Sequence, residues 1–123
     1  MVFVDANIVL EILLSRENKT RAARLLAGSD TCCLSVLSCH LVWYFGRKDG
    51  VADCIIQETI ENFELLDSSA ADYEWALRHE EGKDFEDALQ VAAALRGGCD
   101  TFLTFDRRLA KRYKNLPLNF KHA

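Results

Sequence analysis

The stretch Val2–Leu14, VFVDANIVLEILL, decides the fold because two patterns meet in it. Its first three residues are apolar, as in a buried strand, and this pattern ends at the acid Asp5. From Ile8 onward, apolar residues recur at helical spacing, so a helix follows at once. A buried strand that leads directly into a helix is typical of an α/β domain with a parallel sheet. In such sheets ligands bind beyond the carboxyl ends of the strands, which is where Asp5 stands.

The same alternation continues along the chain. Strands are predicted at residues 2–5, 31–36, 64–67 and 101–106, with an edge strand at 117–120. Helices are predicted at residues 6–15, 18–28, 37–48, 51–63, 69–81, 84–98 and 107–114. Gly28 is expected as a helix C-cap and Ser69 as a helix N-cap. The sequence therefore predicts an α/β fold with helices on both faces of a central parallel sheet.

Length and composition indicate one domain that spans residues 1–123. No apolar run approaches the roughly 20 residues that a membrane span needs, so no membrane partner is expected. The N-terminal residues lack the basic region and cleavage site of a signal peptide. Five cysteines without a CxxC pair argue against a disulfide framework or a zinc site. We therefore expect a cytoplasmic protein.

The net charge of -4 conceals an uneven distribution of charge. The chain is strongly acidic between Asp53 and Asp87, whereas a basic segment follows Asp106. This basic segment begins with Arg107, Arg108, Lys111 and Arg112. Such a run is either a solvated helix face or a surface that binds phosphate groups.

Four aspartates stand where strands end or helices begin: Asp5, Asp84, Asp87 and Asp106. Each has a simple alternative role, since Asp caps helix N-termini and Asp84 and Asp87 are spaced as a capping box. A carboxylate recurs at every one of these places, however, although Ser, Thr or Asn would cap equally well. If the strands are adjacent, these carboxylates meet and need a cation to neutralise them. Oxygen ligands favour Mg²⁺ or Mn²⁺.

Two polar residues flank the strand-end aspartates. Thr104 points to the same side of an extended strand as Asp106, so its hydroxyl can bond to a carboxylate. Asn7 can do the same from the first turn of the helix after Asp5. Both also have ordinary alternatives, as a strand residue and a turn residue.

The segments VFVDANIVLEILL, SVLSCHLVWYFGR, DFEDALQVAAAL and DTFLTFDRRL occur in the order and rough spacing of the PIN domains. Nearly the whole chain resembles this family, and most closely the small nucleases of the VapC toxin type. The resemblance implies a three-layer α/β/α PIN-like fold and a metal-dependent ribonuclease that leaves 5′-phosphate and 3′-hydroxyl ends. It assigns Asp5, Asp87 and Asp106 as metal-binding catalytic acids, with Asn7, Asp84 and Thr104 as supporting residues.

The sequence departs from the family at one position. The family usually has a glutamate in the helix after the second strand, where this chain has His40. His40 is either a substituted ligand that prefers Mn²⁺ or a histidine packed on an apolar helix. Glu11 is a possible compensating acid, with an exposed helix position as the alternative.

The resulting functional hypothesis is an endoribonuclease toxin. The resemblance implies an RNA substrate, gripped by Arg107, Arg108, Lys111 and Arg112, and a protein antitoxin. Apolar segments near the N-terminus are consistent with a homodimer and with antitoxin binding. A catalytically weakened PIN module that binds RNA or protein without cleavage is the alternative. A phosphatase with Asp5 as nucleophile is disfavoured, because that chemistry calls for a second aspartate where Asn7 stands.

Overall fold

The computed structural model describes residues 1–29, 31–82 and 84–122. The described strands are β1 (Val2–Val4), β2 (Cys32–Ser35), β3 (Glu64–Leu66), β4 (Thr101–Thr104) and β5 (Asn119–His122). The described helices are α1 (Ala6–Leu13), α2 (Lys19–Ala27), α3 (Val36–Lys48), α4 (Asp53–Ile60), α5 (Ala70–His79), α6 (Phe85–Arg96) and α7 (Arg107–Arg112). All strand pairs are parallel, in the order β3-β2-β1-β4-β5, which confirms the predicted parallel sheet.

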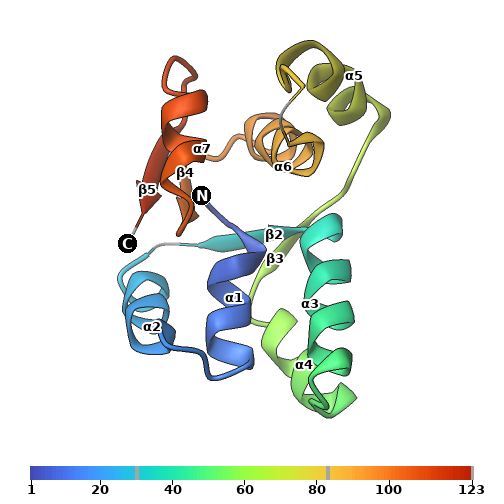
Figure 1. Cartoon of the computed structure of the whole chain (residues 1–123), viewed down its shortest axis with the longest axis vertical. Coiled ribbons are helices and arrows are strands. Elements are labelled where there is room, and N and C mark those ends of the chain that lie inside the picture. The colour runs from blue at the N-terminus through green and yellow to red at the C-terminus, as the bar shows by residue number, and fades with distance from the viewer. Residues whose placement is uncertain (30, 83, 123) are drawn as a thin grey trace.

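Helices cover both faces of the sheet, as the three-layer prediction requires (Figure 1). In Figure 1, α1, α2, α3 and α4 lie below the sheet, while α5, α6 and α7 lie above it. The strand side chains alternate accordingly, since Val2 and Val4 join the core with α1 and Phe3 joins the core with α6. Within β4, Leu103 faces the first core and Phe102 faces the second. Burial on both faces explains why these strands are continuous apolar runs.

The predicted caps of two helices are present. The Ser69 side chain accepts a hydrogen bond from the backbone of Ala71, and Asp72 completes a capping box at the start of α5. Gly28 ends α2 as its C-cap. Asp72 is buried and is bonded by Arg96 at 2.8 Å, so the beginning of α5 is tied to the end of α6. This ion pair fixes α5 and α6, two of the three helices of the upper layer, to each other.

Two expectations need correction, one about the last strand and one about the molecular surface. The edge strand β5 runs from Asn119 to His122, whereas the sequence pattern placed it at 117–120. The apolar α1 residues Ile8, Val9 and Leu10 are buried in the core and do not form an exposed apolar surface. The large exposed hydrophobic side chains lie elsewhere, at Met1, Val36, Tyr44, Ile55, Leu65, Tyr73 and Leu77. No described helix combines the length and the hydrophobicity needed to cross a bilayer.

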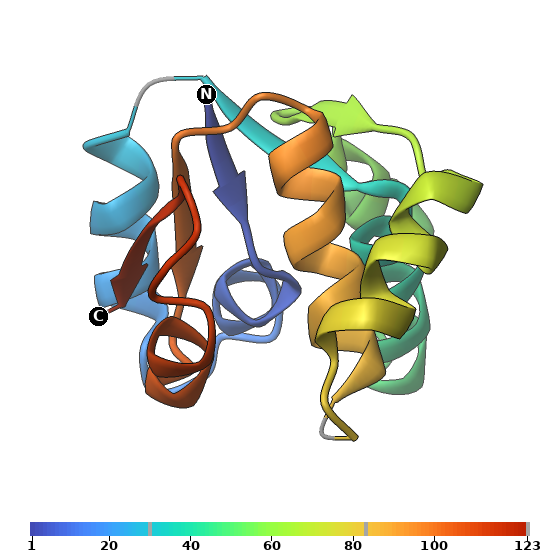
Figure 2. The same ribbon diagram turned by 90° about the horizontal axis from the view of Figure 1, so that it is seen from above.

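The parallel arrangement brings several segments to one end of the sheet. Figure 2 shows β1 pointing toward the end at which α1, α7 and the start of α6 are gathered. β1 pairs with β4 so that Val4 lies beside Leu103, and Asp5 donates its backbone N–H to the Leu103 carbonyl at 2.9 Å. The residues that follow these two strands are therefore neighbours in space although about a hundred positions separate them in sequence.

Candidate active site

Thr104 connects the ends of β1 and β4. Its side chain is fully buried, and its hydroxyl donates to Asp5 Oδ2 at 2.7 Å. Thr104 Oγ1 also accepts the backbone N–H of Asp106 at 3.0 Å and the side-chain N–H of Asn7, whose Nδ2 lies 3.5 Å away. Asn7 Oδ1 in turn accepts from the Phe105 backbone N–H at 3.5 Å. One hydroxyl thus joins Asp5, Asn7 and Asp106 at the carboxyl edge of the sheet.

Asp5 and Asp106 differ in how their carboxylates are used. Asp106 caps α7 by accepting the Arg108 backbone N–H at 2.9 Å. Asp5 occupies the corresponding position before α1, but within the described chain its side chain makes no capping hydrogen bond of normal geometry, although the backbone N–H of Asn7 still lowers the pKa of Asp5. The Asp5 carboxylate is held chiefly by the hydroxyl of Thr104. Capping therefore accounts for the carboxylate of Asp106 more fully than for that of Asp5.

The start of α6 brings two more carboxylates to this edge. Asp84 caps the helix by accepting the Asp87 backbone N–H at 3.1 Å, which is the first half of the predicted capping box. The Asp87 side chain is not used as the second half. It faces Arg112 of α7, whose Nη1 lies 3.6 Å from Asp87 Oδ2. Asp87 is thereby directed across the gap between α6 and α7.

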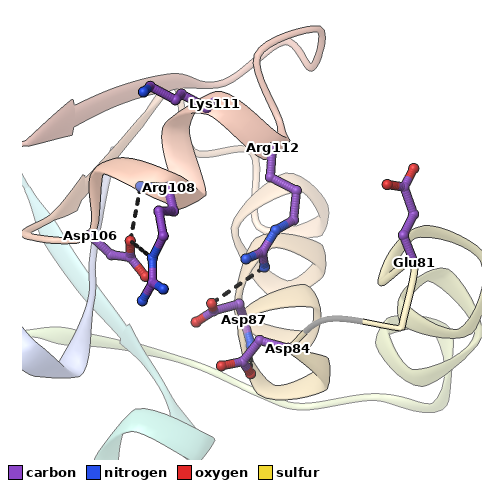
Figure 3. Close-up of a pocket in the computed structure, with 7 residues that line it drawn as sticks. All are labelled: Glu81, Asp84, Asp87, Asp106, Arg108, Lys111 and Arg112. Atoms are coloured by element: carbon purple, nitrogen blue, oxygen red, sulfur yellow. Dashed lines mark hydrogen bonds and ion pairs between the residues drawn. The ribbon is translucent and has the colours of Figure 1, made fainter.

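These side chains line a cleft with a volume of about 680 Å³ (Figure 3). Glu81, Asp84 and Asp87 lie on one side of it, and α7 forms the other side with its basic residues and with Asp106 at its start. Its lining residues are Glu81, Asp84, Asp87, Asp106, Arg108, Lys111 and Arg112. The ion pair between Asp87 and Arg112 spans the cleft at 3.6 Å, whereas the pair between Asp106 and Arg108, also at 3.6 Å, lies within the α7 side. We call this feature the acidic cleft.

The carboxylates of the acidic cleft perturb one another. The pKa of Asp87 is raised to about 6, first by burial and then by repulsion from Asp84, Asp5 and Asp106, while Arg112 opposes the rise. Burial raises the pKa of Asp5, and the hydrogen bond from Thr104 counteracts part of that rise. The carboxylates of Asp5, Asp87 and Asp106 therefore share one electrostatic environment. Additional positive charge in the cleft would relieve their repulsion.

The residues fit a hard divalent cation in chemical type. Among the described residues, no group of three or more His, Cys, Asp or Glu side chains is already arranged closely enough to enclose a metal ion. Mg²⁺ does not need such an enclosure, because it keeps several of its waters and is commonly bound by one or two carboxylates. Arg112 Nη1 is buried without a hydrogen-bond partner in the described part of the chain and faces Asp87. The positively charged guanidinium group of Arg112 therefore already lies beside one of these acids.

His40 is not brought to the acidic cleft. It is exposed on α3 and lines a different pocket with Trp43, Tyr44, Arg47 and Lys48. The reason is helical geometry, because Ser38 faces inward and a residue two positions later lies about 200° further round the helix. Glu11 is likewise used elsewhere, accepting the Asn18 backbone N–H at 3.4 Å. The cleft therefore has no counterpart of the expected α3 acid from either residue.

Three placements go beyond or refine the sequence prediction. Glu86, next to Asp87, raises the pKa of Asp5 by charge repulsion, and its own pKa is raised by burial and by Asp84. Glu81 lines the cleft from the turn before α6. Both glutamates belong to the acidic segment between Asp53 and Asp87, and this segment was the one feature of the sequence that could have pointed to them. Arg108, Lys111 and Arg112 line the cleft as well, whereas Arg107 is exposed on the same helix and is not part of the lining.

The fold and the cleft together define a class of protein: an α/β domain that gathers carboxylates at the carboxyl edge of a parallel sheet. The family model for the PIN domain matches residues 2–115. The chain belongs to the PIN domain family.

Solved structures with the same fold support this assignment. A toxin–antitoxin complex from Klebsiella pneumoniae is 18% identical, covers 96% of this chain and 95% of its own, and gives a TM-score of 0.73. VapBC2 from Rickettsia felis, bound to promoter DNA, is 17% identical, with coverage of 100% and 99% and a TM-score of 0.68. The sarcin–ricin-loop-cleaving toxin VapC20 of Mycobacterium tuberculosis is 18% identical, with coverage of 92% and 95% and a TM-score of 0.74. None of the curated proteins matches this sequence as a relative.

Proposed function

We propose that this PIN domain is a metal-dependent endoribonuclease and the toxin of a toxin–antitoxin pair. The observation that carries the proposal is that Asp87 and Asp106 line one cleft edged with basic residues, while Asp5, at the end of β1, is close enough to raise the pKa of Asp87 by repulsion. A purely structural role does not explain why these acids lie so close together, because their mutual repulsion destabilises the folded protein. A negatively charged substrate that arrives with a divalent cation suits both walls of the cleft.

Asp5, Asp87 and Asp106 would hold the cation, Mg²⁺ or Mn²⁺. When bound, it supplies Lewis-acid activation of water and neutralisation of charge on the phosphate. Thr104 holds the Asp5 carboxylate at the end of β4 through its 2.7 Å hydrogen bond. Asp84 holds the first turn of α6, from which Asp87 projects. Attack in line with the scissile P–O bond would leave a 5′-phosphate and a 3′-hydroxyl.

The basic wall would bind the RNA backbone. Arg108 and Lys111 extend from α7 at the rim of the cleft, where phosphates on either side of the scissile bond can reach them. Arg112 lies deeper, and its Nη1, which pairs with Asp87 by charge but has no hydrogen-bond partner among the described residues, is a donor for a phosphate oxygen inside the cleft. These contacts carry no base specificity, so they orient the backbone and leave target choice to other surfaces.

A protein antitoxin and a second copy of the chain are the proposed partners. Support for the antitoxin comes from the similar structures, several of which are toxin–antitoxin complexes. Exposed apolar residues such as Val36, Tyr73 and Leu77 give surface for such contacts. We also propose a cytoplasmic location, in keeping with the free thiols of Cys33, Cys39, Cys54 and Cys99.

The decisive experiment is RNA cleavage with Mg²⁺ and with Mn²⁺ in parallel, using a structured RNA and its single-stranded counterpart. The wild-type protein should cut, and chelation of the metal should stop cleavage. Asp5→Asn should lower the rate at least about 100-fold, since it removes a charge from the cation site. Asp49→Asn, which changes an exposed acid at the end of α3, is the matched control and should retain full activity.

The alternative function is a PIN module that binds RNA without cutting it. The absence of His40 and Glu11 from the acidic cleft favours this alternative, because the cleft then lacks the acid that the family usually has on α3. Tight RNA binding with no cleavage under either ion would establish it and overturn the nuclease proposal.

A further inference from the structure

Helix α6 presents an unusually smooth face to the sheet. Its buried residues Ala88, Val91, Ala92, Ala93 and Ala94 are small, so they form no large projections that would lock the helix against β2. Helices normally fix their relative position by fitting side-chain ridges into grooves, and short alanine side chains give shallow ridges. The Asp72–Arg96 ion pair ties α6 to α5, so the position of α6 relative to β2 and α3 depends on some other contact.

Gln90 is the exception on this face. It is only 3% exposed and carries a long polar side chain among the alanines. Its Oε1 accepts the Ser35 hydroxyl at 2.5 Å, and its Nε2 donates to Ser38 Oγ at 2.8 Å. Ser35 ends β2 and caps α3, accepting the Ser38 backbone N–H at 3.0 Å. A single amide thus joins α6 to the junction between β2 and α3.

Gln90 stands one helical turn after Asp87, so the two side chains leave α6 from neighbouring positions on its surface. A slip of α6 by one residue would move the Asp87 carboxylate by about 1.5 Å along the axis and turn it by about 100°. Either change would direct Asp87 away from Asp5 and Asp106. The hydrogen bonds of Gln90 oppose both the slip and the rotation.

We propose that Gln90 is a positioning residue: by bonding to Ser35 and Ser38 it sets the register of α6 and so aims Asp87 into the acidic cleft. This inference rests on the proposed function, because it concerns the same cation site. A lone buried polar residue that specifies register at little gain in stability is known from helical assemblies. The same physics applies here because the rest of the interface is apolar and small.

The test compares three variants with the wild-type protein. Gln90→Met keeps the length of the side chain and removes its hydrogen bonds. In this variant the Ser35 and Ser38 hydroxyls keep their bond to each other at 3.3 Å, and Ser35 still caps α3. The double variant Ser38→Ala/Gln90→Met also removes the Ser38 hydroxyl, so the buried Ser35 hydroxyl loses both of its acceptors. Gln57→Met makes the same exchange at an exposed position of α4 and serves as the matched control. For each, the thermal midpoint, the Mn²⁺ dissociation constant and the kcat and KM for RNA are measured.

If Gln90 positions Asp87, Gln90→Met should melt close to the wild-type protein and yet bind Mn²⁺ about 10-fold or more weakly, as when an outer-shell partner of a metal ligand is lost. The double variant should bind Mn²⁺ as weakly and melt lower, because the buried Ser35 hydroxyl then has no acceptor. The kcat of Gln90→Met should fall about as much while its KM for RNA changes little, because the basic wall is intact. Gln57→Met should leave all of these values unchanged.

Several outcomes would overturn the inference. Wild-type affinity for Mn²⁺ in both Gln90 variants would show that the register of α6 does not depend on this amide. Failure of both variants to fold would show that Gln90 is needed for the stability of the core and not specifically for the orientation of Asp87. If the wild-type protein itself binds no Mn²⁺, the proposed function fails, and that result is visible before any variant is compared.

Discussion

Among single residues, Asp87 is held where ionisation is unfavourable. Its side chain is 23% exposed, and three other carboxylates act on it, while Arg112 supplies the nearest positive charge. A protein that kept Asp87 for structure alone would gain stability by replacing it. The ionised Asp87 side chain lowers the stability of the fold, and a destabilising, perturbed carboxylate of this kind is typical of functional sites.

The raised pKa of Asp87, about 6 against an ordinary 3.8, makes stability depend on pH. The folded protein holds the proton more tightly than the unfolded chain, so the extra stability is present below about pH 4 and is lost as the pH rises through about 6. The free energy of unfolding attributable to Asp87 should fall by about 2 kcal/mol over this window, after allowance for solvent screening.

Urea unfolding without divalent ions, at pH 4.5, 5.5, 6.5 and 7.5, would measure this dependence. Asp87→Asn should flatten the slope and should be the more stable protein at the upper end. A variant with the same slope as the wild-type protein would contradict the assignment.

Thr104 should be required for both stability and the ionisation of Asp5. Thr104→Val keeps the shape of the side chain but leaves the buried Asp5 carboxylate without its 2.7 Å hydrogen bond. We expect a loss of about 1–3 kcal/mol in unfolding free energy. The pKa of Asp5 should rise further, so the acid limb of the pH–rate profile should move to higher pH.

Thr104→Ser retains the hydroxyl and is the control for this experiment. It should preserve the acid limb, with only a small loss of stability from the missing methyl group. An unchanged pH–rate profile in Thr104→Val would show that the hydroxyl does not tune Asp5.

Sequence reasoning identified the residues at strand ends more reliably than those on helices. Asp5, Thr104 and Asp106 are placed by the ends of two apolar strands, which the sequence marks clearly. His40 could not be oriented in the same way, because α3 is apolar on several sides and one residue of uncertainty changes the exposed face by 100°. Nor does the sequence show that Asp84 and Asp106 cap helices while Asp5 does not, since all three have the same local pattern.

Helix α7 is the element that should govern affinity for RNA. Arg108→Gln and Lys111→Gln each remove one charge from the rim of the cleft. Each should weaken RNA binding several-fold at moderate salt and lower the slope of log K against log salt by about 0.7, the value for one phosphate on a single strand. Binding titrations at four salt concentrations would measure both quantities.

Arg107→Gln provides the matched comparison on the same helix, because Arg107 is exposed but does not line the cleft. It should have the smaller effect on affinity and on the salt slope. Equal effects of all three substitutions would indicate a general attraction to the helix and not a contact along the cleft.

The elements themselves were largely predictable because hydrophobic periodicity changes sharply between strand and helix in this chain. The exception is β5, which begins at Asn119 and not at residue 117. Its alternation is weak, and its start is set by pairing of Asn119 with Thr101. Register against a neighbouring strand is a tertiary property, so local pattern alone could not place it.

In the molecule as a whole, the acidic cleft is a product of strand order. β1 lies between β2 and β4, and this brings Asp5 next to Thr104 and Asp106, with Asp87 arriving from the helix layer above. The sequence predicts that strands end in acids but does not give the order of the strands. The family resemblance implied a parallel sheet and one shared metal site, and the order of the strands comes from the structure.

A divalent ion should stabilise the whole fold. An ion that binds only the folded state adds about 2.7 kcal/mol to the unfolding free energy at a concentration 100 times its dissociation constant. Mn²⁺ and Mg²⁺ should therefore raise the thermal midpoint, and a chelator should reverse the rise. Asp5→Asn should abolish it, whereas Asp49→Asn should not. A midpoint indifferent to both ions in the wild-type protein would exclude the cation site.

The parallel sheet also separates the two ends of the chain. The ammonium group of Met1 lies 3.9 Å from Asp100 at the amino edge, opposite the cleft, whereas β5 runs toward the carboxyl edge. A purification handle or biosensor anchor fused ahead of Met1 would therefore hold the molecule with the acidic cleft facing solution. The same fusion after β5 would crowd the edge of the sheet at which the acidic cleft lies.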